Sequence, residues 1–174
     1  MEKRKTESAK IASLILACLC VLIFAFGGMS VKAADKDRVS IAFDDPNVTY
    51  SEGHWNNYED RQMYSNTVGS TVTVKFNGTG IAVIGGIAKN GPIAEVNIDD
   101  GAVVEDVDFF SANGTGSAGT VYEKRGLEDG EHTMVLTFTE RYNPAYGGGF
   151  AAMQIAIFGF EELHYSNIER TVTV

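Results

Sequence analysis

Cysteine is scarce in this sequence of 174 residues, and the two that occur, Cys18 and Cys20, both fall within the first 33 residues. The segment 34–174 therefore has no disulfide and must fold by burying apolar side chains, which a segment of that length can do. It also lacks a P-loop, a dinucleotide-binding fingerprint and a GxSxG nucleophile motif, which argues against nucleotide-binding enzymes and serine hydrolases. Its three histidines have no zinc-ligand spacing, so we expect no zinc centre.

Basic residues are also few. The chain has 14 Lys and Arg residues against 23 Asp and Glu residues, a net charge of −9. The first 33 residues hold five of the basic and two of the acidic residues, and subtracting these leaves 9 basic and 21 acidic residues in 34–174, a net charge of −12. Such an acidic surface repels phosphate backbones, so we expect no nucleic acid partner.

The first 33 residues have the pattern of a secretory signal peptide. A basic start is followed by the apolar run 11–26 and by a small-residue exit with Val31 and Ala33 at the minus-three and minus-one positions. We expect cleavage after Ala33 and a secreted or cell-surface bacterial protein. Two alternatives stay open: an uncleaved signal anchor, because the apolar run approaches the roughly 17–25 residues that span a bilayer, and a lipoprotein modified at Cys18.

After this leader, apolar residues recur at every second position, which predicts strands and no helix longer than a turn. In TVTVKF, for example, Val72, Val74 and Phe76 share one face. The NGTG stretch at 77–80 offers Asn and Gly for the positive-φ positions of a short hairpin. We therefore expect a tight turn there, followed by a strand over 81–86 that is buried on both faces.

Further segments of the same kind complete the set: 38–43, 93–98, 104–110, 120–124, 132–138 and 150–161, with turns at 99–101 and 128–130. We predict an all-β domain of about eight antiparallel strands, closed as a two-sheet sandwich. The domain is 34–174 and its core lies in about 38–160. The last residues, 161–174, either add an edge strand through RTVTV or continue into a longer protein, and the pattern leaves both open.

Several segments occur in an informative order: VTYSEGHW at 48–55, the run 63–86, AEVNIDDG at 94–101, VDFFS at 107–111 and VYEKRGLEDGEHTM at 121–134. In this order and spacing they resemble the galactose-binding-like jelly-roll modules of bacterial secreted glycoside hydrolases and surface proteins. The resemblance covers nearly all of 38–160 and implies a jelly-roll sandwich that binds carbohydrate. The chain departs from it at Ala156, where such modules often have an Asp.

Aromatic and polar residues gather in two loop-like stretches, 54–64 and 141–149, which we take as candidate glycan-binding loops. Sugar rings stack on aromatic faces while nearby polar side chains bond their hydroxyl groups. The candidate ligand-binding residues are Trp55, Asn57, Tyr58, Arg61, Arg141, Tyr142, Asn143 and Tyr146. For Trp55, and for the neighbouring Tyr64, the alternative is a structural role at the end of the core.

Acidic residues offer one candidate metal site. Asp44, Asp45 and Asn47 present the oxygen ligands that a structural calcium ion needs, although in so acidic a chain they equally fit a solvated surface. Apart from that calcium we expect no cofactor. No pair of carboxylates stands out as the opposed pair of a glycosidase, so we expect no enzymatic activity.

The hypothesis is a non-catalytic extracellular carbohydrate-binding module whose partner is a glycan or a cell-surface polysaccharide. The alternative is a structural or adhesive cell-surface domain that binds another protein through an apolar patch. Carbohydrate binding predicts that Tyr58, Tyr142 and Tyr146 are exposed and clustered.

Overall fold

The computed structural model describes residues 36–148 and 152–165, all of which belong to one compact unit, Ala34–Val174. The predicted signal segment, 1–33, and the RTVTV stretch, 170–174, lie outside the described residues. Within the described ranges, no helix is long and apolar enough to cross a membrane.

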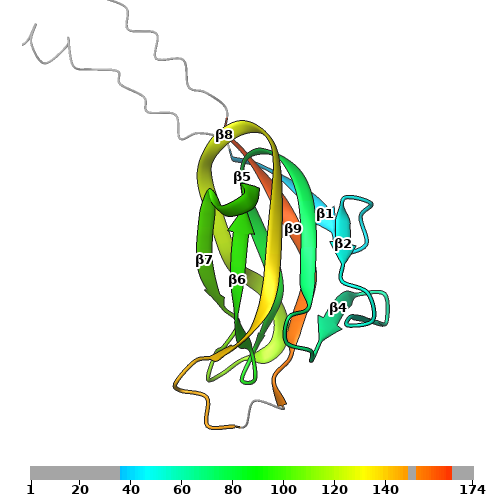
Figure 1. The fold of residues 1–174 in the computed structure, drawn as a ribbon, viewed down its shortest axis with the longest axis vertical. Coiled ribbons are helices and arrows are strands. Elements are labelled where there is room, and N and C mark those ends of the chain that lie inside the picture. Colours follow the sequence, from blue (N-terminus) through cyan, green and yellow to red (C-terminus); the bar gives the residue numbers. More distant parts are fainter. Residues whose placement is uncertain (1–35, 149–151, 166–174) are drawn as a thin grey trace, which may run out of the picture. The chain divides into compact units, whose positions relative to one another are not determined.

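The described part of the chain is built from strands and one short 3-10 turn (Figure 1). In chain order the elements are β1 (Lys36–Ala42), β2 (Val48–Tyr50), β3 (Asn56–Tyr58), β4 (Gln62–Ser65), β5 (Thr71–Ala88), β6 (Pro92–Ile98), η1 (Asp99–Gly101), β7 (Val103–Asp108), β8 (Thr115–Tyr142) and β9 (Ile155–Tyr165). The period-two pattern of the sequence thus predicted the secondary-structure class correctly.

The nine strands of the described residues form one hydrogen-bonded network in the order β3-β4-β9-β5-β8-β6-β7, with β1 also on β9 and β2 also on β5. Every strand pairing in this network is antiparallel. The prediction of an all-β, antiparallel fold is therefore confirmed.

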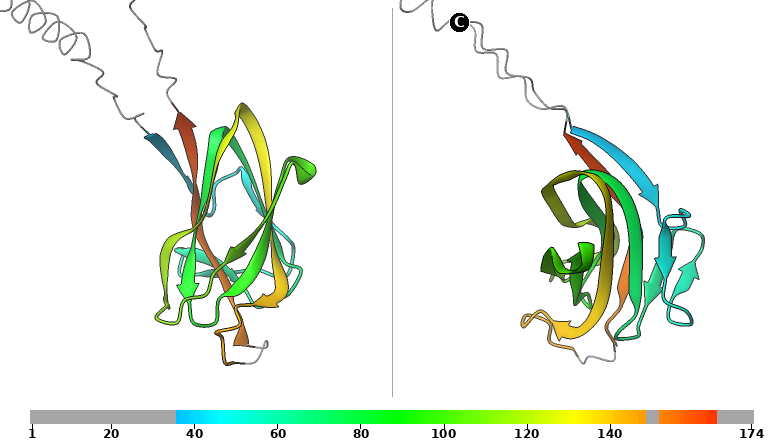
Figure 2. Two further views of the ribbon diagram at one scale, coloured as in Figure 1. Left: turned by 90° about the vertical axis from the view of Figure 1, so that its left-hand side faces the viewer. Right: turned by 45° about the horizontal axis from the view of Figure 1, so that its top comes forward.

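The predicted hairpin turn at 77–80 is wrong. Residues 71–88 form one continuous strand, β5, which pairs along its whole length with β8. Its first half pairs with the second half of β8, as in Phe76↔His132, and its second half pairs with the first half of β8, as in Ile81↔Lys124. Both strands bend at the same level, which Figure 2 shows from two sides.

Glycines at this bend allow backbone to approach backbone. A Cβ atom added to Gly80 would lie 2.3 Å from the carbonyl oxygen of Lys124, and one added to Gly78 would lie 2.8 Å from that of Leu163. Gly78 also has a φ of 128°, which residues with a side chain rarely adopt. Asn77–Gly80 is therefore an irregularity within a strand and not a turn between two strands.

The predicted turn at 128–130 is likewise part of a strand. β8 runs through it, and its register against β5 shifts between the pairs Gly78↔Gly130 and Gly80↔Arg125. Between these two pairs β8 has four residues, 126–129, where β5 has one, so β8 follows a longer path around the bend. The segments 120–124 and 132–138 are thus two halves of one long strand.

One apolar core lies between the two halves of this bent pair. The predicted alternation places its apolar residues there, and β5 is buried on both faces after the bend, as expected for 81–86. Core residues with at most 4% of their surface exposed include Val72, Val74, Phe76, Ile81, Val83, Ala94, Val96, Ile98, Phe109, Met134, Leu136, Phe138 and Phe160. Side chains from both halves of β5 meet in this core, so the bend is what closes it.

The two ends of the fold differ. β1 begins and β9 ends side by side, with Lys36 paired to Tyr165. The end of β8 lies at the opposite end of the strands, at the bottom of Figure 1. Loops that follow β8 therefore lie far from the points where the chain enters and leaves the described fold.

The bend gives a testable prediction. Replacing Gly80 with Ala should lower the free energy of unfolding by about 1–3 kcal/mol, because the new methyl group meets backbone that cannot move aside independently. Gly130→Ala is the matched control, since Gly130 lies at the same bend with open space around its Cβ position, and it should change stability by no more than about 0.5 kcal/mol. Urea denaturation measures both, and equal effects would contradict the role given to Gly80.

Candidate functional site

Three aromatic side chains gather where β8 ends, and we call them the terminal aromatic cluster: Phe110, Tyr142 and Tyr146. The ring centroids of Tyr142 and Tyr146 lie 6.2 Å apart, and those of Tyr146 and Phe110 lie 6.4 Å apart. Tyr142 is 46% exposed, whereas Tyr146 is half-buried and packs partly against the core. The cluster thus combines an accessible ring, Tyr142, with a ring that is anchored on the core, Tyr146.

A short turn after β8 sets this arrangement. The side-chain oxygen of Asn143 accepts a hydrogen bond from the backbone N–H of Ala145 (2.9 Å), and its carbonyl accepts one from the N–H of Tyr146 (2.9 Å). An Asn followed by Pro144 favours such a turn. The turn directs the chain back so that the ring of Tyr146 meets that of Tyr142.

Polar contacts fasten this region to β7 across the intervening strand β6. Arg141 donates to both carboxylate oxygens of Asp106, at 2.5 and 2.7 Å, and these hydrogen bonds lower the pKa of Asp106. Asn143 donates from its amide nitrogen to Asp108 Oδ2 (2.5 Å), and Asp108 Oδ1 accepts the backbone N–H of Phe110 (2.9 Å). The side chains around the cluster are therefore held in fixed positions.

Four predicted site residues, Arg141, Tyr142, Asn143 and Tyr146, are thus brought together. The sequence reasoning missed their partners Phe110, Asp106 and Asp108. Their signal was present in VEDVDFF, where alternation places Asp106 and Asp108 on the same outward face. What the alternation did not reveal is which strand end they would meet.

The other predicted loop forms the β3–β4 hairpin. Asn57 bonds through its side chain to the backbone and carboxylate of Asp60, both at 2.9 Å, and Arg61 lies 3.7 Å from Glu59 within the same turn. Tyr58 is 50% exposed but lies edge-to-face with Tyr64, with centroids 6.5 Å apart. The polar groups of this hairpin are engaged with one another, and its aromatic pair is separate from the terminal aromatic cluster in sequence and in strand pairing.

Trp55 is built into the fold. Its indole N–H donates to the backbone carbonyl of Thr71 (3.0 Å), and its ring lies 5.0 Å from that of Tyr50. Both rings are half-buried and pack against the core. This geometry matches the structural alternative considered for Trp55.

The candidate calcium ligands lie in the turn between β1 and β2. Asp45 accepts the backbone N–H of Asn47 (2.8 Å) and so closes the turn with its own side chain, while Asp44 is exposed. Within the described residues, no group of three or more His, Cys, Asp or Glu side chains is placed to hold a metal ion. Calcium binding by Asp44, Asp45 and Asn47 stays a prediction.

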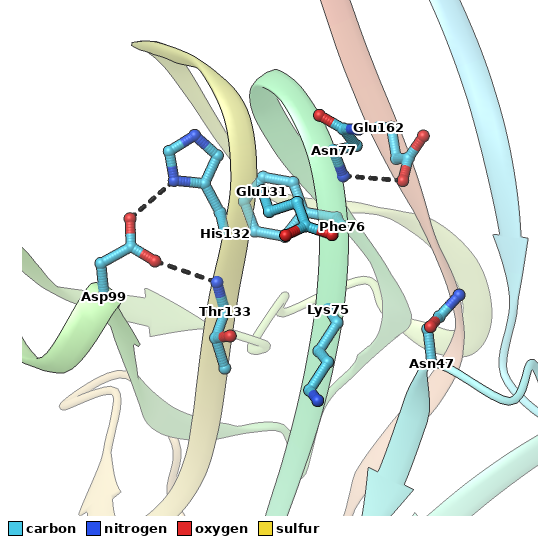
Figure 3. Close-up of a pocket in the computed structure, with 9 residues that line it drawn as sticks. All are labelled: Asn47, Lys75, Phe76, Asn77, Asp99, Glu131, His132, Thr133 and Glu162. Carbon is cyan, nitrogen blue, oxygen red and sulfur yellow. Dashed lines mark hydrogen bonds and ion pairs between the residues drawn. The ribbon is translucent and has the colours of Figure 1, made fainter.

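A hollow of about 380 Å³ lies beside the bend of β5 and β8, away from the terminal aromatic cluster (Figure 3). Its lining is mostly polar: Asn47, Lys75, Phe76, Asn77, Asp99, Glu131, His132, Thr133 and Glu162. Several of these groups already bond one another. The backbone N–H of Asn77 donates to Glu162 (2.9 Å), and that of Thr133 donates to Asp99 (2.9 Å).

His132 is the best-connected side chain of this hollow. Its Nδ1 lies 2.6 Å from Asp99 Oδ2 and its Nε2 lies 2.8 Å from the carbonyl oxygen of Glu128. Both partners are acceptors, so the ring can donate to both of them only when it is protonated on both nitrogens, as an imidazolium. Burial acts to lower the pKa of His132, but the hydrogen bonds to Asp99 and Glu128 outweigh it and the pKa is raised. With both nitrogens occupied, His132 fastens η1 to β8 and has no free nitrogen to act as a base.

Comparison with known proteins gives partial matches. No protein-family model matches the chain. Over 95 residues the chain is 30% identical to "A type blood alpha-D-galactosamine galactosaminidase" of Flavonifractor plautii, an alignment that covers 51% of this chain and 8% of that protein. The chain thus spans less than a tenth of the length of this curated relative.

Two solved structures share the fold. One is a two-domain esterase active on acetylated mannans, co-crystallised with mannopentaose, with a TM-score of 0.57 and 16% identity, covering 90% of this chain and 46% of that one. The other is a family two carbohydrate esterase from Cellvibrio japonicus, with a TM-score of 0.53 and 15% identity, covering 76% of this chain and 36% of that one. The chain corresponds to less than half of either enzyme, and at these identities the likeness concerns the fold.

The His132 contacts predict a pH dependence. Because its pKa is raised in the folded state, the stability it contributes is fully present below its ordinary value of 6.5 and is lost as the pH rises through the folded pKa. The pKa of Asp99 is lowered, since the donors Thr133 and His132 outweigh the effect of burial, so its contribution is lost only as the pH falls through that lower value.

Replacing His132 with Gln should therefore lower the free energy of unfolding by about 1.5 kcal/mol near pH 6 and by less near pH 9. His54→Gln, at an exposed histidine, is the control and should leave the pH profile unchanged. Chemical denaturation across this range measures the difference. Parallel profiles for the wild type and His132→Gln would show that the imidazolium contacts do not stabilise the fold.

Proposed function

We propose that this chain is a non-catalytic, extracellular carbohydrate-binding module of galactose-binding-like, jelly-roll type, which binds a glycan at the terminal aromatic cluster. The observation that supports it most is the grouping of Tyr142, Tyr146 and Phe110 beside fixed polar side chains at one end of the strands. Aromatic rings flanked by oriented hydrogen-bonding groups are what a sugar requires, because its rings are apolar on their faces and polar at their rims.

A two-sheet sandwich fits the strand pairing. In this interpretation, the bend of β5 and β8 divides the network into one sheet with β2, β6 and β7 and another with β1, β4 and β9. The long strands would then pass from one sheet to the other at the glycines of the bend. Such a frame holds the loops at its ends while leaving their sequences free to serve binding.

Four carboxyl groups of the described residues are poorly suited to act as the acid of a glycosidase. A glycosidase general acid needs a raised pKa. Burial acts to raise the pKa of four carboxyl groups, but nearby hydrogen-bond donors outweigh it. The pKa is lowered in Asp99, Glu105, Asp106 and Glu123. A lowered pKa keeps these four carboxyl groups ionised near neutral pH, so they accept hydrogen bonds and do not donate protons.

The relatives supply the carbohydrate context. The relative from Flavonifractor plautii is named for galactosamine, and the two structural neighbours are carbohydrate esterases, one of them crystallised with mannopentaose. In each, this chain corresponds to a minor part of a larger protein. We take this as support for a glycan as the partner class. We do not transfer the enzymatic activity of those proteins to this chain.

The position of the cluster suits an exported module. If residues 1–33 stay attached as a signal anchor, the chain enters the fold where β1 begins, beside the end of β9. The end of β8, which carries Tyr142, lies at the opposite end of the strands (Figure 1). A module attached in this way would present its binding end away from the point of attachment.

Tyr142→Ala should weaken glycan binding by about five- to thirtyfold, because loss of an exposed stacking ring removes about 1–2 kcal/mol of interaction. Tyr58→Ala is the matched control, since Tyr58 is 50% exposed and edge-to-face with a neighbouring tyrosine, as Tyr142 is at 46%. The measurement is a glycan array followed by calorimetry on each bound sugar.

Loss of binding in Tyr142→Ala alone supports the proposed site. Loss in Tyr58→Ala alone would move the site to the β3–β4 hairpin. A folded wild-type protein that binds no glycan would favour the alternative of a structural or adhesive domain with a protein partner.

A further inference from the structure

The rings of the terminal aromatic cluster form a corner and not a flat platform. The planes of Tyr142 and Tyr146 meet at 76°, and those of Tyr146 and Phe110 meet at 62°. The apolar C–H face of a pyranose chair can stack on an exposed ring of this cluster. Because aromatic faces carry partial negative charge, the exposed ring of Tyr142 favours contact with a positive group.

The charges around the corner are predominantly negative. Arg141 is neutralised by its two bonds to Asp106 and lies 4.0 Å from Glu95 as well. Asp108 differs, because its hydrogen-bond donors, the Asn143 amide and the Phe110 N–H, are both uncharged. Within the described residues no cation pairs with Asp108.

Further charges nearby do not reverse this balance. The exposed Glu140 precedes Arg141 on β8, and the exposed Lys89 follows Ala88, which bridges to Phe110. The charged residues of this end are thus Glu95, Asp106, Asp108 and Glu140 on the acidic side and Lys89 and Arg141 on the basic side. The whole chain, with a net charge of −9, adds an attractive field for cations at low salt.

We infer that the terminal aromatic cluster selects glycans that carry a free, protonated amino group, that is, unacetylated hexosamine residues. The ammonium group lies against the exposed ring of Tyr142, on the side of the cluster where Asp108 has hydrogen-bond donors but no cationic partner among the described residues. N-acetylation removes the positive charge and adds bulk, and a uronic acid brings a carboxylate toward acidic side chains. The inference rests on the proposed function, since it assigns the sugar class of that same site.

The test compares matched ligands on the wild-type protein. Four oligosaccharides of equal length, composed of hexosamine, N-acetylhexosamine, neutral hexose and uronic acid residues, are titrated by calorimetry at about pH 6, where an aliphatic amine stays protonated. The hexosamine oligosaccharide should bind at least about tenfold more tightly than its N-acetylated counterpart. Its affinity should also fall as the salt concentration rises, whereas that of the neutral oligosaccharide should not.

A variant series locates the charge that matters. Asp108→Asn keeps the shape of the side chain and should reduce hexosamine affinity by about tenfold while leaving that of the N-acetylated ligand within about twofold. Glu140→Gln should have a smaller effect of the same sign. Asp129→Asn removes an exposed acid at the bend of β8, far from the corner, and should change neither affinity.

The outcomes separate the two proposals. If the N-acetylated, neutral or uronic acid ligand binds as tightly as the hexosamine one, and this binding requires Tyr142, the inference is wrong while the proposed site stands. If a hexosamine preference exists but survives Tyr142→Ala, the ammonium group is bound elsewhere and the inference is again wrong. If no oligosaccharide binds to the folded protein, the proposed function itself fails.

Discussion

The close approach of backbones at the bend of β5 and β8 is the constraint on which this fold depends. The two strands pair with each other on both sides of Gly78 and Gly80, and a side chain at Gly80 would meet the carbonyl oxygen of Lys124. Because both strands bend at one level, the two halves of β5 contribute to a single core. β6 then pairs with the second half of β8, and β9 pairs with the second half of β5. Of the remaining strands, β7 pairs with β6, β1 and β4 pair with β9, β3 pairs with β4, and β2 pairs with the first half of β5.

This constraint also determines where function can lie. The bend is fastened by polar contacts around His132 and by the pairing of β5 with β9, so several of the groups that line the hollow beside it already bond one another. At the far end, β8 runs out beyond the core and its last side chains, Arg141 and Tyr142, are exposed. The rings and carboxylates there are held by backbone and side-chain bonds, which reduces the entropy lost when a ligand binds.

Much of the fold could be predicted from local pattern. Alternation placed Val72, Val74 and Phe76 in the core correctly, because burial of one strand face leaves a signal at every second residue. The stretch 77–80 was misread because Asn and Gly favour a hairpin turn and an irregularity within a strand alike. What decides between them is the partner strand, and Gly80 lies opposite Arg125, which is distant in the sequence.

The candidate site was predictable to a similar degree. Tyr142 and Tyr146 are close in sequence and stood out by composition, whereas Asp108 and Phe110 join them only through contacts made across β6. Trp55 is of a residue type that often stacks on sugars, yet its indole N–H donates to the carbonyl of Thr71. This partner is 16 residues away and comes near only in the folded chain. Local pattern thus found the residues that lie together in 141–146 and missed Phe110 and Asp108, which come from another part of the chain.

The most direct test of the central claim is to map a bound glycan onto the chain by NMR. Backbone amide shifts of the ¹⁵N-labelled protein would be followed during titration with a soluble hexosamine oligosaccharide. The account predicts that the largest changes fall at 106–110 and 141–148, the residues of and around the terminal aromatic cluster. Changes concentrated instead at 57–61, or at the hollow around His132, would contradict it.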